Sequence, residues 1–359
     1  RSFAHAHLAS LDTITTLSHR YGTADYVTGG GGNTSAKDET YLWVKPSGTT
    51  LAQLSPERFV KLRREDIDAL YEPLAEGTDT DALVRDVMAR ATCDTSTRRP
   101  SVEAPLHNLL PSTFVVHTHP PLVNGMTCAR GGKKACRRLF PRALWIPYAD
   151  PGYTICKNIA REIERSYRAC GKQPHLIFVQ NHGLFIGADS IEQMRMLHSN
   201  VFSTLLREYQ ARFIAVGLVL NRGPAQPSIK HMLRAVYGDA RGLCIAEGPG
   251  VKAARGPITP DHVVYSKAHY FHGRPSPAKL NTFRAEWGYW PRVIVTDSYV
   301  AGLGETERKA EIALRMCYDG ARVAQLAKAF GGVHYLRAGH TRFIETWEAE
   351  HYRQKLLSD

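Results

Sequence analysis

The sequence predicts an α/β fold with a substantial core. Apolar runs rich in β-branched residues alternate along the chain with segments whose apolar residues recur at helical spacing. Hydrophobic residues make up 43% of the 359 residues, as in ordinary globular proteins. No run of 18 or more apolar residues occurs, so we expect no membrane-spanning helix. The alternation alone does not determine whether the strands run parallel or antiparallel.

The first part of the chain contains most of the clear elements. Apolar residues near helical spacing predict a helix over residues 3–20, and Ser55 followed by Pro56 predicts the start of another helix. β-Branched runs separated by turn residues predict strands. The other elements expected here are strands over 40–45, 113–119, 143–148 and 175–183, and helices over 80–91, 101–110 (capped by Ser101) and 191–219.

The composition changes after residue 220, where two segments (221–228 and 247–260) are rich in Gly and Pro. We therefore expect an N-terminal domain over residues 1–222 and a C-terminal α/β extension over residues 223–359. Within the extension we expect strands over 261–266 and 292–297, a turn over 302–305, and helices over 305–330 and 341–357.

The net charge of +12 is compatible with two classes of partner. A basic surface favours nucleic acid, and a basic enzyme attracts small anionic substrates. The basic residues are spread along the chain. The densest cluster, GGKKACRR at 131–138, is predicted to be a solvated loop, and no nucleic-acid-binding motif accompanies it. We therefore expect a small anionic substrate and no nucleic acid.

Seven cysteines are scattered along the sequence without a CxxC pair. An odd number at irregular spacing argues against a disulfide framework and against a cysteine-ligated zinc site. The N-terminal segment lacks the order of charged, apolar and small residues that is typical of a signal peptide. These features favour a reducing cytoplasm.

Residues 29–32 are four consecutive glycines. Such a run is costly to order, because glycine loses more backbone freedom on folding than any other residue. It is either a flexible linker or a loop whose bare N–H groups approach an anion. We favour the anion-binding hypothesis. The positions that could converge on one phosphate are Gly32, Asn33, Ser47, Gly48 and Ser101.

Three histidines are candidate metal ligands. His117 and His119 stand two apart at the end of a predicted strand, so their side chains point to the same face. His182 follows another apolar strand. A catalytic zinc ion commonly has three protein ligands and one open position. We interpret His107, His175 and His198 as helix-face or turn residues instead.

Glu103 lies in the first turn of a predicted helix, in RPSVEAPLH. It is either an acid attracted to the helix dipole or a carboxylate beside the metal that serves as general base or labile ligand. The sequence alone leaves both interpretations open.

The order Gly-Asn-x-Ser, Pro-Ser-Gly, Pro-Ser-x-Glu, His-x-His and Asn-His-Gly resembles the class II aldolase/adducin family, over roughly residues 5–215. The tail, with GLGET, FGGVHY and FIETWEAEHYRQK, is similar to the aldolase half of bifunctional rhamnulose-1-phosphate aldolase/dehydrogenase proteins. We find no counterpart of their dehydrogenase half. The resemblance implies a three-layer α/β/α sandwich with a largely antiparallel central sheet. It also implies a homo-oligomer, because related aldolases are tetramers.

The resemblance also implies roles for individual residues. His117, His119 and His182 match the histidines that bind zinc or another divalent ion, and Glu103 matches the catalytic base. The positions that match the phosphate-binding residues are Gly32, Asn33, Ser47, Gly48 and Ser101. Val102 departs from the pattern, because related fuculose-phosphate aldolases have a second serine there, and the charge of Lys45 could compensate. No position here clearly matches the catalytic tyrosine of the aldolases, for which Tyr148 and Tyr153 are candidates.

We therefore expect a metal-dependent aldolase that cleaves a ketose 1-phosphate, such as rhamnulose 1-phosphate, to dihydroxyacetone phosphate and an aldehyde. A sugar-phosphate 4-epimerase or dehydratase of the same family is an alternative. Family epimerases have Asp where this chain has Glu103, which favours the aldolase. A non-catalytic, adducin-like binding module is a further alternative, which the three histidines oppose.

Overall fold

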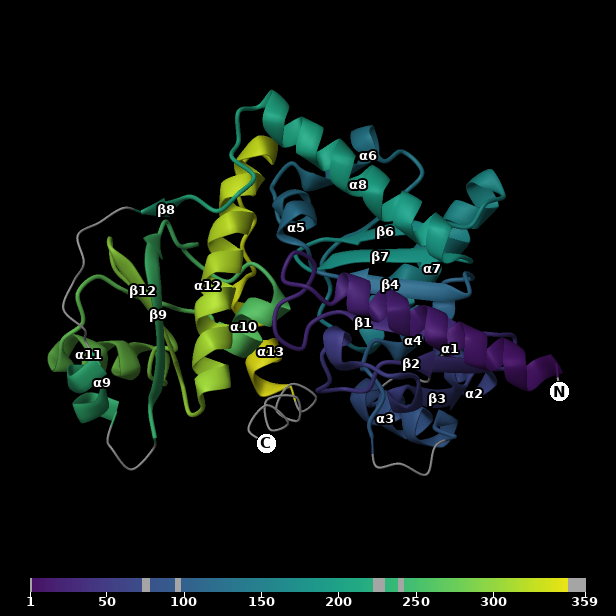
Figure 1. Ribbon diagram of the computed structural model, residues 1–359, viewed down its shortest axis with the longest axis horizontal. Helices are drawn as coiled ribbons and strands as arrows, with labels where there is room; N and C mark the ends of the chain where they lie inside the picture. The colour runs from purple at the N-terminus through teal and green to yellow at the C-terminus, as the bar shows by residue number, and fades with distance from the viewer. Residues whose placement is uncertain (1, 73–77, 94–97, 222–229, 238–241, 348–359) are drawn as a thin grey trace. The chain divides into compact units, whose positions relative to one another are not determined.

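A computed structural model describes residues 2–72, 78–93, 98–221, 230–237 and 242–347 (Figure 1). The chain forms two compact units. Unit 1 comprises residues 1–123 and 133–205, and unit 2 comprises residues 124–132 and 206–359. The expected domain boundary at residue 222 lies outside the described residues. No helix in the described part of the chain is long and apolar enough to cross a membrane.

Unit 1 is built on a seven-stranded sheet with the order β3-β2-β1-β4-β7-β6-β5. β5 and β6 run parallel, and the other neighbouring strands of this sheet are antiparallel. The α/β prediction is therefore confirmed. The strands are β1 (Asn33–Lys37), β2 (Tyr41–Val44), β3 (Val60–Arg63), β4 (Phe114–Thr118), β5 (Leu144–Ile146), β6 (Leu176–Val179) and β7 (Gly183–Ala188).

Helices cover both faces of this sheet. α4 and α7 pack on one face in a core that includes Leu106, Ile159 and Phe185. α1 packs on the opposite face, where the Ser18 and Thr34 hydroxyls lie 2.7 Å apart. The helices up to the end of α8 are α1 (Ser2–Tyr21), α2 (Arg64–Asp68), α3 (Thr80–Ala91), α4 (Ala104–Leu109), α5 (Pro121–Thr127), α6 (Gly132–Leu139), α7 (Tyr153–Cys170) and α8 (Ile191–Ala211).

Unit 2 has its own five-stranded sheet with the order β10-β11-β12-β9-β8. The apolar side of α12 packs on it through residues such as Ala313, Leu314 and Cys317. Its elements are β8 (Leu220–Asn221), α9 (Lys230–Tyr237), β9 (Cys244–Val251), α10 (Pro260–Ser266), β10 (Phe271–His272), α11 (Pro277–Trp287), β11 (Val293–Val295), β12 (Tyr299–Gly304), α12 (Glu307–Ala327) and α13 (Ala338–Thr346).

Many local predictions are confirmed. Helices are present over most of 3–20, 80–91 and 305–330, and strands lie within 40–45, 113–119, 143–148, 175–183 and 292–297. The predicted helix over 341–357 is observed up to Thr346, and residues 348–357 lie outside the described residues.

Two predictions for segments 55–62 and 131–138 are wrong. The segment after Ser55 makes only a short 3-10 turn (Pro56–Arg58), in which Ser55 makes no capping hydrogen bond. It then enters β3, because Val60 and Leu62 alternate inward and pair with β2. The basic segment 131–138 is largely helical rather than a loop, since Ala135 and Cys136 are buried beneath its charged face.

Three further predictions are wrong near or within unit 2. The helix predicted to reach residue 219 ends at Ala211. Residues 261–266 form α10 rather than a strand, and every residue of this helix is buried, so its sequence has no amphipathic period. Residues 302–304 belong to β12 rather than to a turn, and the Gly-Pro-rich 247–251 belongs to β9.

At Gly302, β12 approaches α12 very closely. A Cβ at this position would lie 2.2 Å from the Ala310 carbonyl oxygen and 2.5 Å from the Leu314 nitrogen. We expect Gly302→Ala to lower the free energy of unfolding by roughly 1–3 kcal/mol, since neither backbone can move freely. Urea unfolding measures the change.

The matched control is Gly339→Ala, in α13, where a Cβ would meet no heavy atom within 4 Å. We expect this variant to change stability by less than about 1 kcal/mol. Equal losses in the two variants would contradict the close packing of β12 on α12.

Candidate functional site

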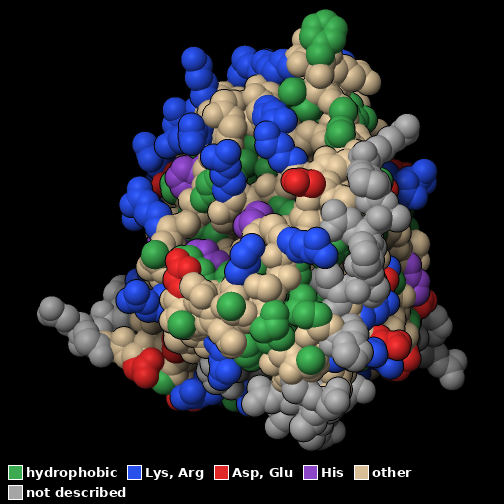
Figure 2. Space-filling model, turned by 90° about the vertical axis from the view of Figure 1, so that its left-hand side faces the viewer, with side chains coloured by type: hydrophobic (Ala, Val, Ile, Leu, Met, Phe, Trp, Pro, Cys, Tyr) green, Lys and Arg blue, Asp and Glu red, His purple; other side chains and the backbone are tan. Residues whose placement is uncertain are grey.

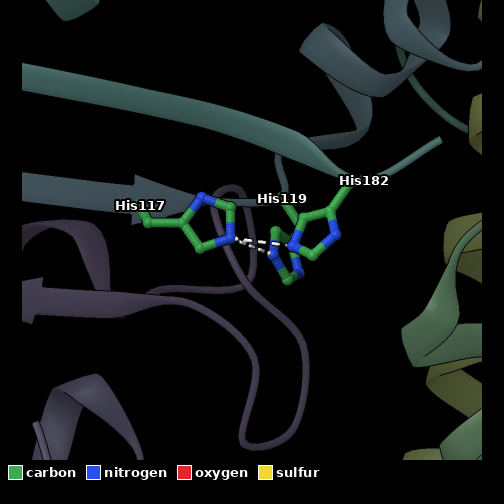
Figure 3. Close-up of side chains that lie close together, drawn as sticks. All are labelled: His117, His119 and His182. Atoms are coloured by element: carbon green, nitrogen blue, oxygen red, sulfur yellow. Dashed lines mark hydrogen bonds between the residues drawn. The ribbon is translucent and has the colours of Figure 1, made fainter. Parts of the chain in front are cut away.

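Three imidazole rings meet where β4 ends beside the turn between β6 and β7 (Figure 3). The Nε2 atom of His117 lies 2.8 Å from Nε2 of His119 and 3.0 Å from Nε2 of His182. Tetrahedral zinc with Zn–N bonds of 2.0–2.1 Å would hold its nitrogens about 3.3 Å apart. The three nitrogens therefore suit one divalent ion and leave room for a further ligand.

His117 is held in the orientation that a metal ligand needs. Its Nδ1 donates to the Leu184 carbonyl oxygen at 3.0 Å, which leaves Nε2 free to face the other two rings. Its ring stacks on Phe185 with 3.7 Å between centroids. Burial lowers the pKa of His117 to about 4, more than the nearby Glu103 raises it. The ring is therefore neutral at pH 7, the state that binds metals.

Backbone conformation and close packing explain why the turn has Asn at position 181 and Gly at position 183. Asn181 has a φ of +52°, a left-handed conformation that asparagine tolerates better than most residues. A Cβ at Gly183 would lie 2.4 Å from the Thr118 carbonyl oxygen and 2.7 Å from Cδ2 of His119. The glycine thus lets β7 start directly against the ring of one candidate ligand.

Glu103 occupies the N-cap position of α4, but its side chain makes no capping hydrogen bond. Its Oε1 lies 3.0 Å from Nε2 of His182 and 3.4 Å from Nε2 of His117. Its Oε2 accepts a hydrogen bond from the Asn33 amide. Burial raises the pKa of the carboxyl, but His117 and His182 outweigh burial and hold the pKa well below its usual range.

Ser101 is not the N-cap of α4, contrary to the sequence-based prediction. Its hydroxyl accepts a hydrogen bond from the Glu103 backbone N–H at 3.2 Å. Its own N–H donates to the Lys45 carbonyl oxygen at 3.0 Å. Ser101 therefore connects the Glu103 segment to the Pro-Ser-Gly turn.

Lys45 links that turn to the glycine loop. Its ammonium group donates to the Thr49 carbonyl oxygen at 2.7 Å and to the Gly30 carbonyl oxygen at 3.4 Å. The N–H of Ser47 donates to the Arg99 carbonyl oxygen at 2.9 Å, which places the two serine-bearing segments side by side. The structure thus brings together the three segments that carry the predicted phosphate-binding residues.

Two of the predicted glycines have backbone conformations that favour glycine. Gly32 has a φ of +74° and Gly48 a φ of +79°. A Cβ at Gly32 would also lie 2.6 Å from Cγ1 of Val27 and 2.9 Å from the His117 carbonyl oxygen. Gly32 therefore also allows the loop to lie against the strand that carries His117.

The structure adds a polar strand that sequence reasoning missed. Asn33, Ser35 and Lys37 of β1 share the face toward α4. The Ser35 hydroxyl lies 2.8 Å from Nδ1 of His107, and the Lys37 ammonium donates to the His107 carbonyl oxygen at 2.7 Å. Burial lowers the pKa of Lys37 to about 7. The available signal was their spacing, since residues 33, 35 and 37 stand two apart and so share one face of a strand.

The other candidates have separate surroundings. His198, on α8, stacks on Tyr21 with 3.9 Å between centroids. Nδ1 of His175 lies 3.0 Å from the Gly187 carbonyl oxygen. The Tyr148 hydroxyl donates to Asp150 at 3.2 Å, and the buried Tyr153 hydroxyl has no hydrogen-bond partner among the described residues. These contacts do not identify a catalytic tyrosine.

Gly183→Ala tests the geometry of the candidate metal centre. The added methyl group would displace the His119 ring, so we expect affinity for one divalent ion per chain to fall by about 10- to 100-fold. Competition with a fluorescent zinc chelator measures this affinity.

The matched control is Gly187→Ala, at the other end of β7, where a Cβ would lie 2.8 Å from the Ser112 hydroxyl oxygen. We expect this variant to lose stability and to keep its metal affinity. Equal losses of affinity in both variants would argue against the role assigned to the Gly183 contact.

Several known proteins are similar to part of this chain. The "Uncharacterized oxidoreductase YuxG" of Bacillus subtilis (strain 168) is 32% identical over 173 residues, which are 45% of this chain and 24% of that protein. The chain thus matches about a quarter of the length of this curated relative.

Solved structures also align with just over half of the chain. The N-terminal class II aldolase domain of a conserved protein from Thermoplasma acidophilum is 26% identical, with a TM-score of 0.47, and the alignment covers 55% of this chain and 92% of that one. L-fuculose-1-phosphate aldolase from Thermus thermophilus is 13% identical, with a TM-score of 0.36, and the alignment covers 57% of this chain and 96% of that one.

The family described as Class II Aldolase and Adducin N-terminal domain matches residues 12–202, more than half of the chain. This range contains the three histidines, Glu103 and the glycine loop. The chain therefore belongs to the class II aldolase and adducin family.

Proposed function

We propose that the chain is a divalent-metal-dependent aldolase that reversibly cleaves a ketose 1-phosphate to dihydroxyacetone phosphate and an aldehyde. The position of Glu103 carries the proposal. A carboxylate at a helix start would be expected to cap the helix, but this one turns toward the histidines. A site with three imidazole ligands and one adjacent carboxylate suits proton abstraction next to a carbonyl group.

We propose that His117, His119 and His182 hold the metal ion, with zinc as the preferred candidate. When bound, such an ion supplies a Lewis acid that polarises the carbonyl of the sugar. The histidine side of the site is preorganised for this role, since Leu184 and Phe185 hold the His117 ring in place.

Glu103 is the proposed acid–base group. In the condensation direction its carboxylate removes a proton from the donor carbon, and in the cleavage direction the carboxyl returns that proton. Asn33 holds Oε2, so Oε1 is the oxygen that faces the reacting atoms. The low pKa keeps this carboxyl ionised at neutral pH, which is the form that can accept a proton.

The phosphate of the substrate is proposed to bind between the glycine loop, the Ser47-Gly48 turn and Ser101. Lys45 supports this arrangement, because its ammonium group ties the glycine loop to the turn. Binding of a group that does not react would orient the carbon atoms that do. Val102 supplies no hydroxyl, so this site offers one hydrogen bond fewer than the related fuculose-phosphate aldolases.

We further propose that the chain has a three-layer sandwich with a largely antiparallel central sheet, in an aldolase-like domain over 1–222 with an extension over 223–359. We also propose a cytoplasmic location and assembly as a homo-oligomer, with a tetramer preferred. An epimerase or dehydratase would use the same groups, and analysis of the products separates these reactions from cleavage.

Release of dihydroxyacetone phosphate from L-rhamnulose 1-phosphate or L-fuculose 1-phosphate tests the reaction. We expect release from at least one of them, loss of release after treatment with EDTA, and recovery with Zn²⁺, because the carbonyl is not polarised without the ion. A coupled assay that reduces the product follows the rate. A metal-loaded protein that releases nothing from either substrate would exclude this assignment.

Glu103→Gln tests the base. The amide keeps the size of the side chain but cannot accept the proton, so we expect kcat to fall by about 10²- to 10⁴-fold while the metal is retained. Glu57→Gln, at an exposed acid of the same unit, serves as the control and should leave kcat unchanged. A Glu103→Gln variant with normal kcat would remove Glu103 from the mechanism.

A further inference from the structure

Unit 2 contains a groove with a volume of about 610 Å³ that the proposed aldolase reaction does not use. It lies between the segment 213–221, the segment after β9 at 252–255, the outer side of α12, and the turn at 332–335. The volume lies within the range of roughly 300–1,000 Å³ that is typical of small-molecule sites.

The charges in this groove have one sign. Arg130, Lys252, Arg255 and Lys328 line it, and no Asp or Glu does so among the described residues. Within the described part of the chain, none of the four side chains forms an ion pair. A concave surface lined by one sign of charge focuses its field and attracts ions of the opposite sign. The face shown in Figure 2 likewise carries more Lys and Arg than Asp and Glu side chains.

One wall of the groove is held in place by side chains of α12. The Gln325 amide donates to the Ala215 and Gly217 carbonyl oxygens and accepts from the Val219 N–H at 3.1 Å. The Arg322 guanidinium donates to the Val216 carbonyl oxygen at 3.0 Å. The segment after α8 has no regular secondary structure over 214–219, so these bonds fix the position of this wall.

Phe213 stands on the rim of the groove in an unusual state. Its side chain is 96% exposed, and its φ is +55°, which is uncommon for a bulky residue. Both the exposure of its ring to water and the strain of its backbone make phenylalanine an unfavourable residue at this position. Val219, also on the groove, is 56% exposed. The groove thus offers an aromatic ring and an aliphatic wall beside its four cations.

We propose that this groove binds a nucleoside di- or triphosphate. The four cations would hold the phosphates, because charge-assisted hydrogen bonds from Arg and Lys to phosphate are strong. The base would pack against Phe213 and the apolar wall. A bare phosphate would use only the cations, and an uncharged ring would use only the wall. A nucleotide uses both and is large enough to fill the groove.

Titration calorimetry on the full chain tests the proposal with four separate ligands: ATP, GTP, adenosine and inorganic tripolyphosphate. We expect a nucleotide to bind at one site per chain, tripolyphosphate to bind more weakly, and adenosine more weakly still. Absence of nucleotide binding at millimolar concentrations would overturn the proposal. Tripolyphosphate binding as tight as that of the nucleotides would overturn it too, because the groove would then be an anion site only.

Variants locate the site. The double variant Lys252→Ala with Arg255→Ala should weaken nucleotide binding by about tenfold or more. Arg308→Ala, at an exposed position in the first turn of α12, is the matched control and should leave the affinity unchanged. An equal loss in the control would place the binding outside the groove.

Phe213→Gly separates binding from folding. Glycine adopts a positive φ without strain, so the melting temperature should stay the same or rise. Affinity for the nucleotide should fall by about three- to tenfold, and affinity for tripolyphosphate should not change. A variant that keeps full nucleotide affinity would show that the ring is not used and would overturn the assignment of a nucleotide.

Discussion

The pairing of β4 with β1 on one side and β7 on the other determines where the groups of the candidate site lie. Asn33, His117 and Phe185 are direct partners across these three strands. Direct partners project from the same face of a sheet, and here that face is covered by α4, which begins just after Glu103. A shift of one residue in either pairing would turn His117 to the opposite face. The register is therefore the constraint on which the site depends.

Burial makes the polar groups of this site depend on one another. Asn33, Lys45 and Glu103 are each at most 8% exposed, and a buried charge without partners would be strongly unfavourable. Each has partners within the site: Glu103 contacts the histidines and Asn33, and Lys45 contacts the carbonyl oxygens of two loops. Such a network has little freedom to rearrange, which suits the proposed binding of an ion and a substrate in fixed geometry.

The two units carry chemically different candidate sites. The family match ends at residue 202 and the main part of unit 1 ends at Leu205, so the shared family and the three-histidine site both belong to that unit. Unit 2 has its own sheet and its own apolar core. Its groove is lined by cations and by an exposed Phe213, so its chemistry differs from that of the histidine site.

The sequence by itself determined the α/β class, the strand that carries His117, and the choice of the three histidines, because these depend on local periodicity and on side-chain chemistry. The tertiary structure decided what local pattern cannot express. The buried α10 shows no amphipathic period. The turn of the Glu103 carboxyl away from its helix end depends on His182, which is 79 positions further along the chain. α8 ends at Ala211, and the chain beyond it hydrogen-bonds to side chains of α12 more than 100 residues away. Contacts between residues so distant in sequence do not affect the pattern of neighbouring residues, so only the folded structure shows them.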